Sequence, residues 1–577
     1  MNDSIIIGFD TEYVYRPDSQ SNHILSYQYA GMTAQGMWTG IVYTQGAEKK
    51  HRLKLRELMG IAIEAGRDQK ILGRTWPSKV YAAAHFTRAD LASFKDFNVL
   101  KTQFDALRGS YSTISSSYRC TYHDKNRHVH DLEIVLRDTM AITPGGSSLA
   151  AIGDLHQYEK IKLPHGAIEQ MDKLLVDDPD LFKRYAIRDA EIAAKHAWAM
   201  MEFAEAQGLG NEPPLTIGSL ATNHILSLWD SENIEVNAIL GRETVREQKW
   251  TGRGYRTINR DVPLPQVHDH ISLATESYHG GRNEAYMFGF THDDFWFDID
   301  LSGAYSTAMA AIRIPDYASL YEDRDPKNYT CDVLGLARVR FRFPDDTRFP
   351  CLPVRSNHGL IFPLEGVTHV ASPEIELALQ MDADISIEHG IIVPWANEVR
   401  PFELFSRGVR QHRKEHKKGS IYERTWKEIG NSVYGKLAQG LREKRIYDSR
   451  TNSSQILPPS KITQPYLAAY VTSIVRAVLG ELIAKIPSDK VVVSATTDGF
   501  ISNAPKENVD VSGTLSLFFA DLAERMTGSR DFLEMKHIVP QVLCFKTRGQ
   551  LTVGLLVNEH LTLTPYWRLK LIHLIQC

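Results

Sequence analysis

Three aspartates that lie far apart in the chain each accompany a short apolar run. Continuous apolar runs that are rich in β-branched residues predict buried strands, and a buried strand must pair with others in a sheet. The chain must therefore fold so that sheets carry these carboxylates at or near strand ends. The aspartates are Asp10 after Ile5 to Phe9, Asp300 after Phe295 to Ile299, and Asp498 at the tip of a hairpin predicted over Val491 to Phe500.

Strand-like and helix-like segments alternate through roughly the first 205 residues. "VYAAAHF" (Val80 to Phe86) and "DLEIVLRD" (Asp131 to Asp138) are predicted strands. A helix follows in which Asp178 is the N-cap and Pro179 the first helical residue. Such alternation predicts an α/β domain, and the pattern breaks at "GLGNEPP", residues 208–214.

The rest of the chain has a mixed pattern that predicts further domains of the α+β class. Residues 311–400 hold short alternating strands and many prolines, whereas residues 402–440 are basic and helical. Tyr466 to Ile486 reads as a buried helix that leads into the hairpin around Asp498. We therefore expect an α/β and α+β multidomain protein.

Composition limits the kinds of protein that this chain can be. Its 577 residues are enough for several domains, and its five widely spaced cysteines contain no CxxC pair, so neither a disulfide framework nor a zinc knuckle is predicted. No apolar run approaches the length of a membrane span and the N-terminus lacks signal-peptide features, so we expect a cytoplasmic protein without a membrane partner.

Net charge bears on the partner of the protein. The formal net charge is −4, so a nucleic-acid-binding surface would have to consist of local basic patches. One candidate is "RGVRQHRKEHKK", residues 407–418, in which Arg410 and Arg413 could contact phosphates. A solvated helix face is the alternative interpretation of this run.

Acidic residues of the N-terminal domain fall in a pattern that suits metal binding. Asp10 and Glu12 are two apart on a strand, so both side chains face the same way. Side-by-side carboxylates repel each other unless a cation lies between them, and oxygen ligands suit Mg²⁺ or Mn²⁺. Asp90 follows the second apolar run, and Tyr185 and Asp189 share one helix face. Taken alone, the Asp10 and Glu12 pair could equally be solvated surface acids.

This ordered set resembles the three motifs of the DEDDy 3′-to-5′ exonuclease domain, an RNase H-like fold, of family B DNA polymerases. The resemblance implies that two metal ions are held by Asp10, Glu12, Asp90 and Asp189, with Tyr185 orienting the attacking water. Many relatives have asparagine where this chain has Phe86, which predicts altered handling of the 3′ end. The adjacent His85 is interpreted as a packing or hydrogen-bonding residue rather than a metal ligand.

Two further segments resemble the metal-binding motifs of the family B polymerase site. "DIDLSGAYSTAM" is similar to motif A, with Asp300 as metal ligand and Tyr305 as the residue that excludes a ribonucleotide, although Tyr305 could also be a core tyrosine. "TTDG" is similar to motif C, with Thr496 in place of its first aspartate. Because Asp300 and Asp498 match the acids that bridge both metals, we expect two Mg²⁺ or Mn²⁺ ions to bind in this site too.

"KEIGNSVYG" matches motif B of the same family at every fixed position. Lys427, Asn431 and Tyr434 recur at helical spacing, so one face of the fingers helix would carry all three. By resemblance the lysine contacts the incoming triphosphate, and the tyrosine offers a stacking plane to the nascent base pair.

Two weaker resemblances concern DNA contact. Tyr278, Gly280 and Gly281 resemble the YxGG element that touches the template strand, although a paired glycine alone could be an ordinary turn. Lys546 and Arg548 resemble the KxY element that grips the primer, with arginine in place of tyrosine, which keeps phosphate affinity and loses a packing plane.

The resemblance extends from Asp10 to about Gly549 and implies a right-hand polymerase with two insertions. The residues after this range are fewer than a family thumb would need. The expected segments are an exonuclease domain (1–205), a linker and first part of the palm (206–310), a β-rich insertion (311–400), fingers (401–440), a second short insertion (441–465), a second part of the palm (466–550), and a vestigial or truncated thumb (551–577).

The TDG form of motif C and the two insertions resemble the primer-independent polymerases of mobile elements, a group similar to protein-primed viral and plasmid enzymes. We therefore expect a monomeric DNA-directed DNA polymerase with proofreading, whose partners are template, primer and dNTPs, with a terminal protein or no primer at initiation. Its setting would be a prokaryotic cell or a virus- or plasmid-infected host. Two alternatives stay open: a polymerase-weakened protein that acts mainly as a nuclease or DNA-binding protein, and a catalytically silent remnant.

Overall fold

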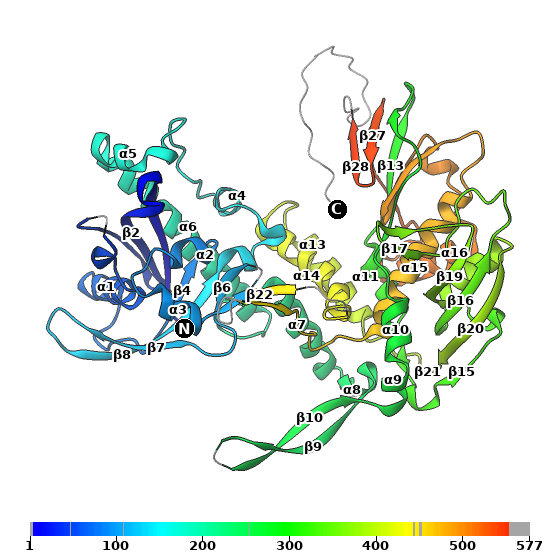
Figure 1. Ribbon diagram of the computed structural model, residues 1–577, viewed down its shortest axis with the longest axis horizontal. Helices are drawn as coiled ribbons and strands as arrows, with labels where there is room; N and C mark the ends of the chain where they lie inside the picture. The colour runs from blue at the N-terminus through cyan, green and yellow to red at the C-terminus, as the bar shows by residue number, and fades with distance from the viewer. Residues whose placement is uncertain are drawn as a thin grey trace. The chain divides into compact units, whose positions relative to one another are not determined.

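The computed structural model describes residues 4–46, 48–107, 109–252, 254–441, 445–448 and 453–552 (Figure 1). Contacts divide the chain into two compact units. Unit 1 comprises residues 1–227, 409–432 and 442–458, and unit 2 comprises residues 228–408, 433–441 and 459–577. The predicted thumb lies almost wholly outside the described residues, as do residues 442–444 and 449–452 of the predicted second insertion.

Unit 1 is built on a six-stranded mixed sheet with the order β3-β2-β1-β4-β8-β7. The central strands β1, β4 and β8 run parallel, and the outer strands pair antiparallel with their neighbours. Alternating strands and helices therefore form an α/β domain, as predicted. The strands are β1 (Ile6–Arg16), β2 (Ser21–Thr33), β3 (Gly36–Tyr43), β4 (Lys79–Ala84), β7 (Tyr118–His123) and β8 (Val129–Asp138).

Helix α6 (Pro179–Ala206) packs on β1 and β2, and it begins as predicted because the Asp178 side chain accepts a hydrogen bond from the Leu181 amide at 2.9 Å. Gly8 of β1 makes this packing possible: a Cβ there would lie 2.2 Å from the carbonyl oxygen of Ala190 in α6. The missing side chain lets the helix backbone lie directly on the strand. Helix α1 (Leu55–Asp68) also contacts the sheet, through β2, β3 and β7.

Two local predictions in unit 1 were wrong. Strand β1 does not end before Asp10 but continues to Arg16, because the antiparallel partner β2 extends the ladder past Asp10 and Glu12. The segment "TRADLASFKDF" after Phe86 has a helix-like sequence that predicts a longer helix, but helix α2 begins at Thr87 and ends already at Leu91. The remaining elements of unit 1 are α2 (Thr87–Leu91), α3 (Phe97–Gln103), α4 (Leu149–Leu155), α5 (Met171–Asp177), β5 (Asp105–Leu107), β6 (Ser110–Ser112), β22 (Arg445–Asp448) and β23 (Ser453–Ile456).

Unit 2 contains a five-stranded sheet with the order β11-β24-β25-β13-β26. Its strands come from segments far apart in sequence, because β13 near residue 300 pairs antiparallel with β25 near residue 500. The strands are β11 (Arg282–Ala285), β13 (Trp296–Leu301), β24 (Val492–Thr497), β25 (Gly499–Ser502) and β26 (Leu533–Val539).

The predicted β-rich segment 311–400 forms a four-stranded sheet, order β15-β20-β16-β19, together with one helix, α12 (Ser372–Gln380). Its strands are β15 (Tyr321–Glu322), β16 (Leu334–Arg342), β19 (Glu365–Ala371) and β20 (Asp384–Val393), and the small pairs are β14 (Ile314–Pro315) with β21 (Trp395–Asn397) and β17 (Val354–Ser356) with β18 (Gly359–Ile361).

Helix α15 (Pro465–Ala484) runs through the core of unit 2 and contacts α10, α11, α12 and α16. It is long and apolar enough to cross a membrane by length and composition, so the expectation that no such run exists was wrong. However, 94% of its apolar window is buried inside the structure. Arg476 within this helix is buried and binds Glu374 of α12 through two nitrogens, at 2.8 and 2.9 Å.

Other elements of unit 2 include a long hairpin, β9 (Arg242–Trp250) with β10 (Tyr255–Pro263), and a three-stranded sheet of β12 (Gly289–Phe290), β27 (Val542–Lys546) and β28 (Gly549–Thr552). Its further helices are α8 (Val236–Leu240), α9 (Pro265–Asp269), α10 (Ile271–Ser277), α11 (Ala304–Met309) and α16 (Thr514–Thr527), and three helices continue from one unit into the other: α7 (Ile217–Ser231), α13 (Glu403–Glu415) and α14 (Ile421–Leu437).

Candidate active sites

Asp10, Glu12 and Asp189 form the first carboxylate cluster, in unit 1. One ligand oxygen from each lies within 4.8 Å of the other two, which suits a shared metal ion. Asp10 and Glu12 project from β1 on the side that Gly8 opens to α6, and α6 supplies Asp189. The predicted meeting of these three acids is thus seen in the structure.

Burial and mutual repulsion hold the protons on this cluster. The pKa of Asp10 is raised to about 7, first by burial and then by the charge of Asp189, while a hydrogen bond from Gln28 at 2.8 Å opposes the rise. Burial and the charge of Asp10 likewise raise the pKa of Glu12. In the part of the chain that the structure describes, the buried Oδ1 of Asp189 has no hydrogen-bond partner. A divalent cation would satisfy this oxygen and remove the repulsion, so the residues fit a metal ion.

Lys160 belongs to the same site and was missed by the sequence analysis. Its Nζ lies 2.6 Å from Oδ2 of Asp189 and 5.0 Å from the centre of the Tyr185 ring. Burial, and then the charge of Asp189, raise the pKa of Tyr185 to about 12, so its hydroxyl keeps its proton. Lys160 lies in a segment without regular structure between α4 and α5, and no periodic pattern could have identified it.

Asp90 lies beside the first cluster but faces Thr11. The Thr11 hydroxyl donates a hydrogen bond to Oδ1 of Asp90 at 2.9 Å, and burial followed by the charge of Asp10 raises the pKa of Asp90. It is buried, 4% exposed, and is not among the three acids whose oxygens lie within 4.8 Å of one another. Its role as a metal ligand stays a prediction.

Phe86 begins the short helix that carries Asp90, and it has a left-handed backbone with φ of 63°. Asparagine adopts this conformation more readily than phenylalanine does. Asp138 holds the turn by accepting hydrogen bonds from the amides of Phe86 and Thr87 at 3.0 and 3.1 Å. His85 lies 3.1 Å from the Thr139 hydroxyl, a hydrogen-bonding position of the kind predicted for it.

Asp300 and Asp498 meet in unit 2. Strand β13 pairs with β25 so that Asp300 lies opposite Gly499, the residue that follows Asp498. The amide of Leu301 donates a 2.8 Å hydrogen bond to the carbonyl oxygen of Asp498, which fixes the register of this pairing. Asp300 on β13 thus lies next to the turn between β24 and β25 that carries Asp498, although the two acids are nearly two hundred residues apart in sequence.

A third acid, Asp298, completes the second carboxylate cluster, which we define as Asp298, Asp300 and Asp498. Burial raises the pKa of Asp298 to about 7, with contributions from the charges of Asp300 and Asp498. Lys536 opposes this rise, and its Nζ lies 3.9 Å from Oδ2 of Asp300. The sequence analysis missed Asp298, although the spacing of "DID" is the same as that of Asp10 and Glu12.

Thr497 makes the tight turn that presents Asp498, with a left-handed φ of 61° that is strained for a β-branched residue. The Asp498 amide closes the turn on the carbonyl of Thr496 at 2.7 Å. Arg548 braces the turn: its Nη2 donates to the Thr497 hydroxyl at 3.1 Å and its Nε to Asn283 at 2.7 Å. Arg548, predicted to contact DNA, therefore has partners inside the protein.

Gly281 and two tyrosines lie next to this turn. A Cβ on Gly281 would lie 2.9 Å from Cα of Thr497 and 3.0 Å from the Tyr305 hydroxyl, so only glycine fits here. The rings of Tyr305 and Tyr434 are stacked, with centroids 4.1 Å apart and planes 10° apart. Motifs A and C, the Gly-Gly element and Tyr434 of motif B thus converge at one place in unit 2. Gly280 has open space around it, and the carbonyl oxygen of Tyr278 accepts a hydrogen bond from Arg355.

The remaining residues predicted to contact nucleotide or DNA include exposed side chains and side chains with partners inside the protein. Lys427 and Asn431 are exposed on α14, whereas Trp426 and Val433 are buried, so the predicted polar face exists. Arg413 pairs with Glu423 at 2.8 Å, and burial and the charge of Arg413 lower the pKa of Arg410. Lys546 is exposed at the end of β27.

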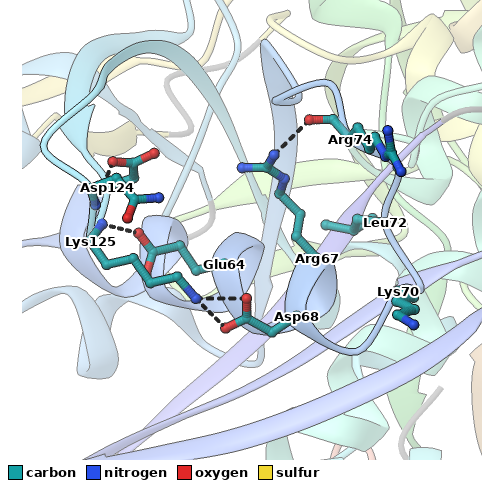
Figure 2. Close-up of a pocket in the computed structure, with 10 residues that line it drawn as sticks. Glu64, Arg67, Asp68, Lys70, Leu72, Arg74, Asp124 and Lys125 are labelled. Carbon is teal, nitrogen blue, oxygen red and sulfur yellow. Dashed lines mark hydrogen bonds and ion pairs between the residues drawn. The ribbon is translucent and has the colours of Figure 1, made fainter.

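A pocket elsewhere in unit 1 is not connected with either cluster. Figure 2 shows it between the end of α1 and the turn from β7 to β8, lined mainly by charged residues. These charges satisfy one another: Lys125 pairs with Asp68 at 2.7 Å, and Arg67 donates to the carbonyl of Arg74 at 2.6 Å. Acidic and basic side chains both line the pocket, so it offers no patch of a single sign to a ligand.

Comparison with known proteins places the chain in a family. Residues 253–472 match the model of DNA polymerase type B, organellar and viral, and this range includes Asp300 and motif B. Over 575 residues, 95% of the chain, the sequence is 38% identical to the primer-independent DNA polymerase PolB of Escherichia coli. The chain belongs to the family B DNA polymerases. It spans 66% of the length of that relative.

Solved structures agree with the fold of this family B chain. The ternary complex of Phi29 DNA polymerase with primer-template DNA and incoming nucleotide matches with a TM-score of 0.60 and 11% identity, over 95% of this chain and 86% of that one. The binary complex of Phi29 DNA polymerase with primer-template DNA matches with a TM-score of 0.58, 11% identity, and coverage of 95% and 87%. The predicted family and fold class are therefore confirmed, whereas the roles of individual residues stay predictions.

Proposed function

We propose that this family B chain is a DNA-directed DNA polymerase that extends a 3′ end with dNTPs. The proposal is supported above all by the pairing of β13 with β25, which sets Asp300 and Asp498 side by side. Two carboxylates in that relation, with Asp298 two residues before Asp300 on β13, form a site of high negative charge that divalent cations would stabilise.

In this proposal Asp300 and Asp498 hold two Mg²⁺ or Mn²⁺ ions, which when bound would polarise the attacking 3′ hydroxyl and the departing pyrophosphate. The hydroxyl of Thr496 stands where the family has an acid, which affects metal affinity more than the chemistry itself. Lys427 would attract the triphosphate. The stacked rings of Tyr305 and Tyr434 would contact the sugar and the base of the incoming nucleotide.

We propose a second reaction, 3′-to-5′ exonuclease activity, for the first cluster. Asp10, Glu12 and Asp189, with Asp90 beside them, would hold the divalent cations. The protonated hydroxyl of Tyr185 can donate a hydrogen bond to water or to the scissile phosphate. Lys160 adds a positive charge 2.6 Å from Asp189, which compensates part of the negative charge brought by the substrate.

The relative described as a primer-independent polymerase supports the further proposal that this chain can begin synthesis without a conventional primer. Its partners would then be a DNA template and dNTPs, with a terminal protein or none, in the replicon of a mobile element or virus. Monomeric action in the cytoplasm belongs to the same proposal.

One observation favours a second candidate, a protein that acts mainly as a nuclease. Among the described residues, the acids that could jointly ligate one ion by close oxygen spacing are those of the first cluster. A weakened polymerase site would leave hydrolysis as the main activity.

Primer extension distinguishes these functions. Wild type, Asp498→Ala and Asp10→Ala proteins receive labelled primer-template, Mg²⁺ and dNTPs, and the products are separated by length. The proposal predicts elongation by wild type and Asp10→Ala, and only shortening by Asp498→Ala. If wild type only shortens the primer, the nuclease function replaces the proposal; if no protein changes its length, both functions are wrong.

A further inference from the structure

The hairpin of β9 and β10 lies outside the core of unit 2, and most of its residues are exposed. Figure 1 shows it as a two-stranded ribbon that extends away from the sheets of unit 2. Most of its side chains are exposed on both faces. A two-stranded hairpin that packs on no other element is only marginally stable in water. A long exposed hairpin of this kind is therefore a candidate binding surface.

The base of the hairpin is fixed to unit 2. Arg242 donates hydrogen bonds to the carbonyls of Lys461 and Thr463 at 3.0 and 2.8 Å. Within the hairpin, the Thr244 hydroxyl of β9 donates to Asp261 of β10 at 2.7 Å. At the other end the amide of Thr251 donates to the carbonyl of Gly254 at 2.9 Å, which closes the turn. The hairpin is therefore anchored at its base, and its two strands are joined by backbone hydrogen bonds as far as Thr251 and Gly254.

Two aromatic rings occupy one face of the tip. Trp250 and Tyr255 are directly opposite in the ladder, 58% and 71% exposed, with their centroids 5.2 Å apart in an edge-to-face arrangement. Going down the same face, the next opposed pairs are Gln248 with Thr257 and Arg246 with Asn259, all exposed. The face thus offers ring planes, hydrogen-bonding groups and a cation, with no acid before Asp261.

Two cations occupy the other face of the tip. Lys249 and Arg256 are directly opposite in the ladder, where like charges destabilise a sheet. Within the residues that the structure describes, no carboxylate pairs with either of them, and the nearby Glu247 pairs with Arg260 at 3.3 Å. The arrangement costs stability in the isolated protein and becomes favourable only beside an anion.

We propose that the tip of the β9–β10 hairpin binds single-stranded DNA, with bases stacked on Trp250 and Tyr255 and phosphates near Lys249 and Arg256. Exposed rings stack on unpaired bases, whose faces are hidden in a duplex, and cations alongside follow the backbone. The inference takes DNA as the partner from the proposed function. An anionic membrane also attracts aromatic and basic residues, but the polar side chains that continue the aromatic face argue against insertion into lipid.

The test measures binding without catalysis, by fluorescence anisotropy in EDTA with labelled oligothymidylate and with a blunt duplex of equal length. In the variant Trp250→Leu with Tyr255→Leu, both side chains stay apolar but lose their stacking planes. We expect its Kd for the single strand to rise about tenfold or more while its Kd for the duplex changes less than about twofold. Glu243→Ala, on the same hairpin but away from the tip, is the matched control and should bind like wild type.

A charge-reversed variant, Lys249→Glu with Arg256→Glu, keeps the aromatic pair and tests the cations. The dependence of log Kd on log salt should flatten by about 1 or more for the single strand. Unchanged single-strand binding in both variants, or an equal loss on the duplex, would overturn the inference. So would loss of binding to phosphatidylserine vesicles with no loss on oligothymidylate, which would make the tip a membrane contact.

The result of this binding test can be distinguished from the result of the primer-extension test of the proposed function. Asp498→Ala, which should abolish extension, should keep wild-type affinity for oligothymidylate in EDTA. If the wild type fails to extend a primer and the tip variants still weaken single-strand binding, the polymerase proposal fails while the hairpin inference stands. If extension proceeds and the tip variants bind normally, the hairpin inference alone fails.

Discussion

Asp300 covers Gly499 so closely that a Cβ at position 499 would lie 1.9 Å from Oδ1 of Asp300. The two residues are opposite each other in the pairing of β13 with β25, and Gly499 directly follows Asp498. A glycine at this position therefore allows the Asp300 carboxylate to lie against the backbone that presents the other acid. The geometry of the second carboxylate cluster therefore depends on glycine at position 499.

Gly499→Ala should strongly reduce primer extension. The new methyl group would displace the Asp300 carboxylate or the hairpin by an ångström or so, and misplacement of that size costs about a hundredfold in rate. Gly408→Ala is the matched control, because nothing lies within 4 Å of a Cβ there. Steady-state extension rates would be compared; a Gly499→Ala protein that is as active as the Gly408→Ala protein would show that this contact is unimportant.

Arg548→Ala should lower the rate of nucleotide addition more than it changes the KM for dNTP. Loss of the hydrogen bonds to Thr497 and Asn283 would release the strained turn that presents Asp498. We expect a decrease of about tenfold in kcat, with partial recovery in Arg548→Lys, which can still reach one partner. An increase in the KD for primer-template with unchanged kcat would instead indicate the DNA contact suggested by the resemblance.

The pKa of Asp10 makes the stability of the metal-free protein depend on pH. Since the pKa is about 7 in the folded protein and 3.8 in a model peptide, folding is favoured by the bound proton. That contribution is complete below pH 3.8 and is lost as the pH rises toward 7. In EDTA the Tm should therefore fall between about pH 5 and 8, and Mg²⁺ or Mn²⁺ should raise it more at pH 8 than at pH 6.

Asp10→Asn removes the ionisable carboxyl group and should make the Tm in EDTA less dependent on pH. Asp131→Asn, which changes an exposed acid of the same sheet, should not. Differential scanning fluorimetry across this pH range measures all three proteins. A wild-type Tm that is flat or rises in EDTA would contradict the assignment of repulsion to the first cluster.

Lys160→Ala should reduce exonuclease activity and leave extension intact. Removing Nζ leaves Asp189 without its ion-pair partner and takes a cation away from Tyr185. We expect about a hundredfold loss in hydrolysis of a labelled single strand, which is at the lower end of the cost of removing a group that stabilises transition-state charge. Lys162→Ala changes an exposed lysine of the same segment and should have no effect on hydrolysis; equal losses in both variants would rule out a specific role for Lys160.

The first cluster was predictable to the extent that local rules determine it. Alternation on a strand puts Asp10 and Glu12 on one face of β1. Helical spacing puts Tyr185 and Asp189 on one face of α6. Lys160 follows no such rule because it lies in an irregular segment, and Asp90 proved to face Thr11 rather than join the closely spaced acids.

The second cluster depends on pairings between distant segments, which local patterns do not encode. Motif resemblance brought Asp300 and Asp498 together as an expectation, but the register that sets Asp300 on Gly499 follows from the whole sheet. The stacking of Tyr305 on Tyr434 and the bracing of Thr497 by Arg548 are likewise contacts between segments more than fifty residues apart. They could be found only in three dimensions.

The central claim is that Asp300 and Asp498 jointly hold the divalent cations of nucleotide addition. The most direct measurement is Mn²⁺ binding, followed by electron paramagnetic resonance, in a background where Asp10→Ala and Glu12→Ala silence the first cluster. The protein would carry a dideoxy-terminated primer-template and the next dNTP. Asp300→Asn and Asp498→Asn should each lose tightly bound Mn²⁺ relative to the background protein, whereas undiminished binding in both would contradict the account.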